Sequence, residues 1–92
     1  MTDDLFSIKD KIVLISGAGR GIGRHLAHSM ARHSAIVYCI DKKFSKEVPK
    51  SVKKNMFHIK CDITKKKSIQ VVCKNIFLKH KKIDVLVNNA GI

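Results

Sequence analysis

A glycine-rich segment between an apolar run and a helical pattern constrains this chain more than any other feature. The segment extends from Ser16 to Gly23, reads S-G-A-G-R-G-I-G and holds four of the five glycines. It follows residues 11–16, an apolar run typical of a buried parallel strand, and precedes a helical pattern over 21–33. A strand-to-helix turn of this kind presents backbone N–H groups that can hold phosphates. The sequence therefore predicts a phosphate-binding loop, and the alternative is a tight turn without a ligand.

Three of these glycines have separate expected roles. Gly17 allows the tight turn off the strand, and Gly21 lets the backbone approach a pyrophosphate. Gly23 lets the helix lie close to the sheet. The spacing is G-x-x-x-G-x-G rather than G-x-G-x-x-G, but the chemistry it allows is related.

An acidic residue ends the next apolar run. A carboxylate at Asp41 can accept hydrogen bonds from the ribose hydroxyls of adenosine and repel a 2′-phosphate, which favours NAD over NADP. The alternative is a turn acid with no ligand. Three nearby cations could instead hold a 2′-phosphate: Arg20, Lys42 and Lys43.

Strand and helix periodicities alternate along the whole chain. Apolar runs predict four strands, at 11–16, 35–40, 56–61 and 83–88. Helical patterns separate most of these runs, which predicts right-handed crossovers and parallel pairing, with the fourth strand beside the first. The expected fold is α/β, a truncated Rossmann-like three-layer structure with a parallel sheet of about four strands. The lysine-rich segment 42–54 is expected to hold only a short helix, because Pro49 interrupts it.

The two longer predicted helices have apolar faces of helical spacing. The face of the first comprises Ile22, Leu26, Ala27, Met30 and Ala31, with Arg24, His25, His28 and Arg32 opposite. The face of the second comprises Ile69, Val72, Cys73, Ile76 and Phe77. Thr64 is the expected N-cap of the second helix. Three lysines, 65–67, follow in the first turn, where the helix dipole disfavours cations, so we expect this end to fray.

Composition limits the other possibilities. With 92 residues the chain has room for a single domain, 1–92, and its 19 basic against 7 acidic residues give a net charge of +12. Such a charge suits nucleic acid or an anionic membrane, but 16 of the cations are lysines and aromatic residues are few. We therefore expect a solvated basic surface and no nucleic-acid partner, and the alternative is a basic nucleic-acid-binding protein.

Other sequence features point to a protein without membrane spans or metals. The longest apolar run is far shorter than a transmembrane span, and the N-terminus lacks the features of a signal peptide, so we expect a cytoplasmic protein. The cysteines Cys39, Cys61 and Cys73 form no C-x-x-C pair and are expected to be core residues. No metal site is expected, and His25 and His28 are expected to be surface residues.

Four motifs together resemble the N-terminal part of a short-chain dehydrogenase/reductase. Ser16–Gly23 resembles the T-G-x-x-x-G-I-G loop of that family, with Ser16 in place of Thr, and Asp41 resembles the acid that selects NAD. Residues 61–64 (C-D-I-T) resemble the segment after the third strand, and residues 88–91 (N-N-A-G) resemble the signature after the fourth. The resemblance covers about residues 11–92, and the sequences of the first and fourth strands with their following motifs are most similar to the retinol and 17β-hydroxysteroid dehydrogenase branch.

The resemblance implies a role for each matching residue. The phosphates would be wrapped by the loop residues Gly17, Ala18, Gly19, Arg20, Gly21 and Ile22, with Gly23 behind them. Asp41 would hold the adenosine ribose, and the Asp62 side chain and Ile63 backbone would contact adenine. The cofactor riboses would be bordered by Asn89, Ala90 and Gly91, with Asn88 tying the strands together.

The same resemblance implies that the catalytic half is absent from these 92 residues. The family's Ser and Tyr-x-x-x-Lys follow the fourth strand, and we assign no catalytic residue here. Tyr38 and Lys42 have the right spacing, but they lie on a predicted strand, where residues four apart are about 13 Å from each other.

The expected function is the cofactor-binding part of an NAD(P)-dependent oxidoreductase of alcohols or ketones, with retinoids or steroids as candidate substrates. This part is not expected to be active alone. The other alternative is a non-catalytic module that binds a dinucleotide or a partner. The apolar fourth strand (Val85, Leu86, Val87) would leave an exposed edge through which the chain could associate.

Overall fold

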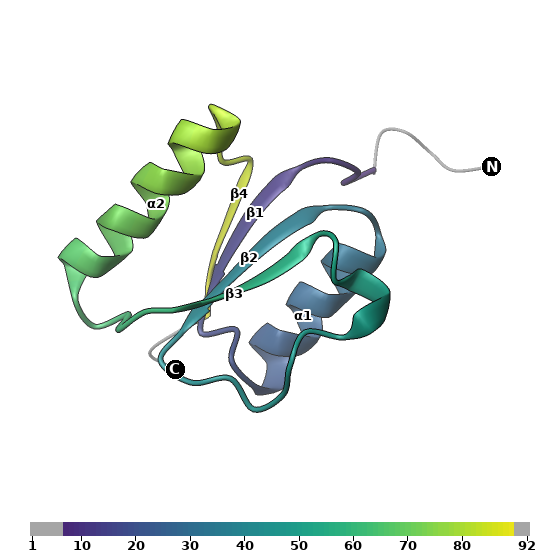
Figure 1. Ribbon diagram of the computed structural model, residues 1–92, viewed down its shortest axis with the longest axis horizontal. Helices are drawn as coiled ribbons and strands as arrows, with labels where there is room; N and C mark the ends of the chain where they lie inside the picture. The colour runs from purple at the N-terminus through teal and green to yellow at the C-terminus, as the bar shows by residue number, and fades with distance from the viewer. Residues whose placement is uncertain (1–6, 90–92) are drawn as a thin grey trace.

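Four parallel strands form one sheet with a helix on each face (Figure 1). The computed structural model describes residues 7–89. The strand order is β3-β2-β1-β4, which confirms the predicted α/β fold and places the fourth strand beside the first. In chain order the elements are β1 (Ile12–Ser16), α1 (Gly21–Arg32), β2 (Ile36–Asp41), the 3-10 helix η2 (Lys50–Val52), β3 (Met56–Lys60), α2 (Lys66–His80) and β4 (Val85–Asn88).

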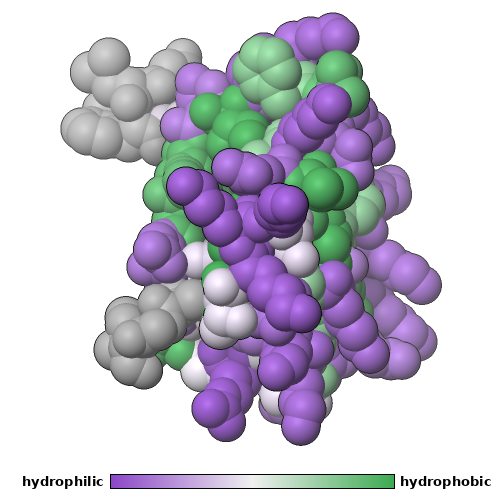
Figure 2. Space-filling view, turned by 90° about the vertical axis from the view of Figure 1, so that its left-hand side faces the viewer, coloured by the Kyte–Doolittle hydropathy of each residue, from purple (hydrophilic) through white to green (hydrophobic). Residues whose placement is uncertain are grey.

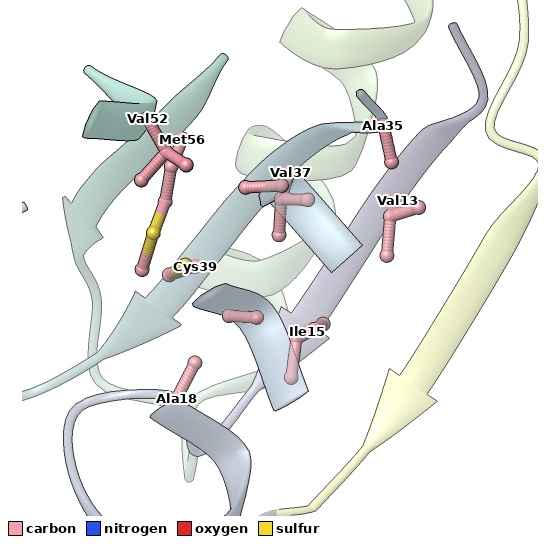
Figure 3. Close-up of a cluster of buried hydrophobic side chains, with 10 residues drawn as sticks. Val13, Ile15, Ala18, Ala35, Val37, Cys39, Val52 and Met56 are labelled. Atoms are coloured by element: carbon pink, nitrogen blue, oxygen red, sulfur yellow. The ribbon is translucent and has the colours of Figure 1, made fainter. Parts of the chain in front are cut away.

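Alternate residues of the central strands build a separate core on each face of the sheet. Val13, Ile15 and Val37 point toward α1, together with Met56 of β3 and Val52 of η2 (Figure 3). On the other face, Ile12, Leu14, Tyr38 and Ile40 pack against α2, together with Cys61 and Ile76. All five residues of β1 are buried, as the uninterrupted apolar run of a doubly covered strand requires.

Helix α1 approaches the sheet through its smallest residues. Gly23, Ala27 and Ala31 recur every four positions and are buried, so the helix axis can lie close to β1 and β2. The predicted apolar face was wrong at two positions, because Ile22 is 80% exposed and Leu26 is also exposed. The cause is geometric: the helix turns its glycine and alanine stripe inward, and the larger side chains lie on its flank.

Helix α2 contacts the sheet through Ile69, Val72, Cys73 and Ile76, as the spacing predicts. Phe77 does not belong to this face, since it is 53% exposed. The N-cap prediction was also wrong. The capping position is Lys65, which makes no side-chain capping bond, while the Thr64 hydroxyl donates to Asp62 Oδ1.

The end strand β4 is attached through Asp84, which immediately precedes it. Asp84 Oδ2 accepts a hydrogen bond of 2.7 Å from the backbone N–H of Ile12 and lies 3.2 Å from Lys82 Nζ. The Ile12 bond, followed by the Lys82 interaction, lowers the pKa of the Asp84 carboxyl from its ordinary value. Val85 and Val87 are half-buried and pack on the α1 side, whereas Leu86, on the other face, is 66% exposed.

Three further features concern expectations drawn from the sequence. Cys39 and Cys61 are buried, as predicted for core residues, and Cys73 is half-buried. The expectation of a surface position holds for His25 but was wrong for His28, which is half-buried. Within residues 7–89, no helix has both the length and the apolar character to cross a membrane.

Candidate functional site

The glycine loop leaves β1 at Ser16 and enters α1 at Gly21. Gly17 (φ 71°) and Gly21 (φ 61°) both adopt left-handed backbone conformations, which residues with a side chain rarely adopt. The Gly17 N–H donates to Ile40 O at 2.9 Å, which ties the loop to the end of β2. Arg20, at the N-cap of α1, supplies no side-chain capping bond, and the first turn holds no acid. The N–H groups of this turn are therefore available to an anion.

The other glycines of the loop are required by close packing. A Cβ on Gly19 would overlap the carbonyl oxygen of Lys43 and lie 2.8 Å from Asp41 Oδ2. A Cβ on Gly23 would overlap the carbonyl oxygen of Gly17. At Gly21, in contrast, no heavy atom of the described residues lies within 4 Å of such a Cβ. The loop thus packs tightly against the protein on one side and is open at Gly21, a shape that fits a phosphate cradle.

Asp41, at the end of β2, is fastened to this loop. Its Oδ2 accepts the Gly19 N–H at 2.9 Å, and its Oδ1 accepts the Lys42 N–H at 2.7 Å. The carboxylate is half-buried at one wall of a cavity of about 460 Å³. The cavity is lined by Gly19, Arg20, Asp41, Lys42, Lys43, Phe44 and Ser45. The acid and the three cations named from the sequence therefore surround one space.

Two residues of this cavity were missed in the sequence analysis. Ser45 donates to Gly19 O through both its N–H (2.8 Å) and its hydroxyl (3.1 Å). Ser45 therefore holds the carbonyl of Gly19, while Asp41 holds its N–H. Phe44 stacks on His58 with ring centroids 4.0 Å apart. They follow Asp41 in an irregular loop, and no periodicity or motif in the sequence marks them.

Asp62 and Ile63, the predicted adenine contacts, follow β3. Asp62 Oδ1 accepts bonds from the Thr64 hydroxyl and from the Thr64 N–H (3.0 Å). These bonds lower the pKa of the Asp62 carboxyl. The Ile63 side chain packs against the core under α2, so its role toward a ligand would fall to its backbone, as the resemblance implies.

The segment after β4 closes the other side of the glycine loop. The Ser16 hydroxyl donates to Asn88 Oδ1 at 3.0 Å, which ties β1 to β4. The Asn89 side-chain amide donates to Gly17 O at 3.1 Å, and the Asn89 N–H donates to Ser16 O at 3.2 Å. Two of the predicted contacts, Ala90 and Gly91, lie outside the described residues.

The strand order arranges these groups in a row along the carboxyl edge of the sheet. From β3 to β4, the row passes from Asp62 to Asp41, then to the glycine loop and finally to Asn89. Adenine, ribose, pyrophosphate and the second ribose follow one another in the same order along an extended dinucleotide. The chain also turns from one side of β1 to the other here, and open α/β sheets bind ligands at such a reversal.

The other candidate sites within the described residues lack groups suited to binding a cofactor or to catalysis. A depression of about 510 Å³, lined by residues such as Ala31, Ile36 and Asn55, lies at the amino end of the strands, away from these groups. No cluster of three or more metal-ligating side chains occurs within 7–89. Burial raises the pKa of the Cys39 thiol to about 12, which keeps it protonated and unreactive at neutral pH. Tyr38 lies on β2 and its hydroxyl is 2.6 Å from His80 Nε2, so it forms no catalytic pair with Lys42.

Comparisons with known proteins agree with the fold and with the family resemblance. The family model described as short chain dehydrogenase matches residues 11–92. The chain therefore belongs to the short-chain dehydrogenase family. The NAD-dependent glycerol dehydrogenase of Listeria innocua is 35% identical over 92 residues, which cover 98% of this chain and 36% of that protein. Retinol dehydrogenase 12 of Mus musculus is 34% identical, over 92% of this chain and 29% of its own length.

A solved structure shows the same likeness in three dimensions. The short-chain dehydrogenase from Leptospira borgpetersenii with bound NAD+ has a TM-score of 0.83 and is 32% identical. The match covers 100% of this chain and 35% of that protein. The chain thus spans about a third of the length of these relatives.

Proposed function

We propose that this chain binds NAD as the cofactor-binding part, 1–92, of an oxidoreductase. The observation that carries the proposal is the row of groups along the carboxyl edge, ordered as the parts of a dinucleotide are ordered. The bound NAD+ of the Leptospira relative and the NAD dependence printed for the Listeria relative support it. When bound, NAD supplies hydride transfer. The residues assigned here would bind and orient the dinucleotide.

The substrate of the whole oxidoreductase is proposed as an alcohol or ketone, since hydride transfer interconverts these groups. The similarity to a retinol dehydrogenase supports a retinoid among them, and a steroid is proposed from the resemblance of the motifs alone. The resemblance assigns the catalytic Ser and Tyr-x-x-x-Lys to positions after the fourth strand. We therefore propose that residues 1–92 hold the cofactor without carrying out the reaction, and that the protein is cytoplasmic.

The first prediction is that the purified chain binds NAD more tightly than NADP and does not turn it over. Asp41 presents a carboxylate where the adenosine ribose would lie, and a 2′-phosphate there meets its charge. Calorimetry with both dinucleotides measures the preference, and absorbance of NADH in the presence of alcohols measures turnover. Asp41→Asn should narrow the preference, because the charge is removed and Arg20, Lys42 and Lys43 remain. Tighter binding of NADP by the unaltered chain would contradict the assignment of Asp41.

A second candidate function, a partner-binding module, is favoured by the edge of the sheet. Strand β4 pairs with β1 on one side only among the described strands, and it contains no charged residue. Unpaired edges of this kind recruit other strands. We propose a second copy of this chain as the partner, joined edge to edge through β4 about a two-fold axis.

Self-association through this edge should increase with protein concentration and with salt, because salt screens the repulsion between two chains of charge +12. Leu86→Lys should return the chain to monomer, since Leu86 is 66% exposed on β4. The matched control is Leu78→Lys, which introduces the same charge on α2 at a leucine that is 55% exposed. Sedimentation equilibrium measures the mass. A wild-type mass that stays monomeric at all concentrations and salt levels would exclude this association.

A further inference from the structure

Helix α2 and its flanks contain the most uniform charge in the chain. Between Asp62 and Asp84 the sequence holds no acidic residue. Seven lysines fall in the same stretch: 65, 66, 67, 74, 79, 81 and 82. Within residues 7–89 the only ion pair joins Lys82 to Asp84, so the other six have no acidic partner there. Nucleotide binding does not explain this concentration of unpaired positive charge, because these lysines lie outside the row of site residues.

The outward face of α2 combines these lysines with apolar side chains. Ile69, Val72 and Ile76 are directed into the core, which fixes the orientation of the helix. Positions 67, 71, 74 and 78 are spaced by four, three and four residues and share the opposite face. Val71 is 58% and Leu78 55% exposed there, and Lys67 and Lys74 are exposed as well. The face therefore alternates lysine, valine, lysine and leucine along its length.

Figure 2 shows the side of the molecule on which α2 lies. Hydrophilic side chains cover most of it, and smaller hydrophobic areas lie between them. The helix has 15 residues and is about 22 Å long at 1.5 Å per residue. A partner for this face must accordingly offer negative charge over an extended surface and also accept isolated apolar groups.

We propose that the outward face of α2, defined by Lys67, Val71, Lys74 and Leu78, binds the surface of an anionic lipid bilayer. Lysine ammonium groups would lie among anionic headgroups while their alkyl stems extend along apolar surface. Val71 and Leu78 would enter the boundary between headgroups and acyl chains. Because the larger apolar face is already buried in the core, the binding is peripheral, reversible and dependent on salt.

The composition of this face favours lipid over nucleic acid. Single-stranded nucleic acid is usually held by aromatic platforms together with positive charge, and duplex DNA is read through arginine forks. Of the three exposed apolar residues of α2, Val71 and Leu78 are aliphatic and Phe77 is the single aromatic, and α2 contains no arginine. An aliphatic side chain gains little from a phosphate backbone but is removed from water at a bilayer.

The test measures co-sedimentation of the full chain with vesicles of phosphatidylcholine alone and with vesicles that also contain phosphatidylserine. The wild type should bind only the anionic vesicles. Lys67→Gln/Lys74→Gln should lower the partition coefficient at least about tenfold, given the attraction of each lysine to such a surface. Val71→Ser/Leu78→Ser should also weaken binding at unchanged net charge.

The matched control is Lys53→Gln/Lys54→Gln, which removes the same charge from exposed positions beside η2. That turn belongs to the core on the α1 face, across the sheet from α2 (Figure 1). The control should change binding less than about twofold. Circular dichroism verifies that each variant is folded, and NAD calorimetry should give the same affinity for all of them.

Equal losses in the α2 variant and in the control would overturn the proposal, because binding would then depend on net charge alone. Equal binding to neutral and anionic vesicles would overturn it as well. Binding to single-stranded RNA that falls with Lys67→Gln/Lys74→Gln, without binding to vesicles, would assign the face to nucleic acid instead. Failure of NAD binding in the wild type would contradict the proposed function but would leave this proposal intact.

Discussion

Replacing Gly19 with alanine should abolish measurable NAD binding and also destabilise the protein. The added Cβ would overlap the carbonyl oxygen of Lys43 and approach Asp41 Oδ2 at 2.8 Å. Either the glycine loop or the segment after β2 must then move, and overpacking of this kind costs about 1–3 kcal/mol. The same movement breaks the Gly19 N–H bond to Asp41, so the phosphate cradle and the ribose acid lose their relative position.

Gly21→Ala is the matched comparison, since it adds the same methyl group in the same loop. No described heavy atom is within 4 Å of the new Cβ, so its structural cost is limited to the left-handed backbone at φ 61°. That cost is about 1 kcal/mol. NAD binding should nevertheless fall, because the methyl group enters the open side of the cradle.

The two variants are distinguished by thermal unfolding and calorimetry measured side by side. Gly19→Ala should lower both the melting temperature and NAD affinity strongly, whereas Gly21→Ala should lower mainly the affinity. If Gly19→Ala melts at the wild-type temperature, the loop is not packed against Lys43 as described.

Truncating Leu14 to alanine should lower the free energy of unfolding by about 3 kcal/mol. Leu14 is 0% exposed at the centre of β1, in the core under α2. A domain this small has little stability in reserve, of the order of 5–10 kcal/mol. The melting temperature should therefore fall by more than about 10 °C.

Leu86→Ala is the matched control for this variant, because it makes the same truncation at the residue paired with Leu14 on the neighbouring strand. Leu14 and Leu86 are paired across β1 and β4, but Leu86 is 66% exposed. The same truncation there should change the free energy of unfolding by less than about 0.5 kcal/mol. Urea denaturation at low protein concentration measures both values. Similar losses at the two positions would mean that α2 does not cover β1 while leaving β4 exposed.

The sequence was sufficient for the order and type of the main elements because their signals are strong. The apolar run that contains Leu14 predicts a buried strand. The spacing of Ile69, Val72 and Ile76 predicts the inward face of a helix. Failures occurred where tertiary packing decided between faces of a helix. Ile22 and Leu26 have the right spacing for a buried face, but a stripe of glycine and alanine allows closer approach and occupies that position instead.

The site was predictable where backbone geometry demands a particular residue. Gly17, Gly21 and Gly23 could be named because left-handed turns and close packing leave few other choices. Phe44 and Ser45 could not be named, since they line the cavity through the path of an irregular loop. Thr64 was assigned to the helix, but the nearby carboxylate of Asp62 competed for its hydroxyl. The roles of these residues toward NAD remain predictions.

The closure of the glycine loop by Asn88 and Asn89 has a consequence for the order of folding. The bonds from Ser16 to Asn88 and from Asn89 to Gly17 each connect residues 72 positions apart. When β1, α1 and β2 have emerged from the ribosome, β1 still lacks β4, its neighbour on one side of the sheet. The loop can reach its final geometry only after β4 has docked. Contacts of such long sequence separation slow folding, so we expect β4 docking to be a late step.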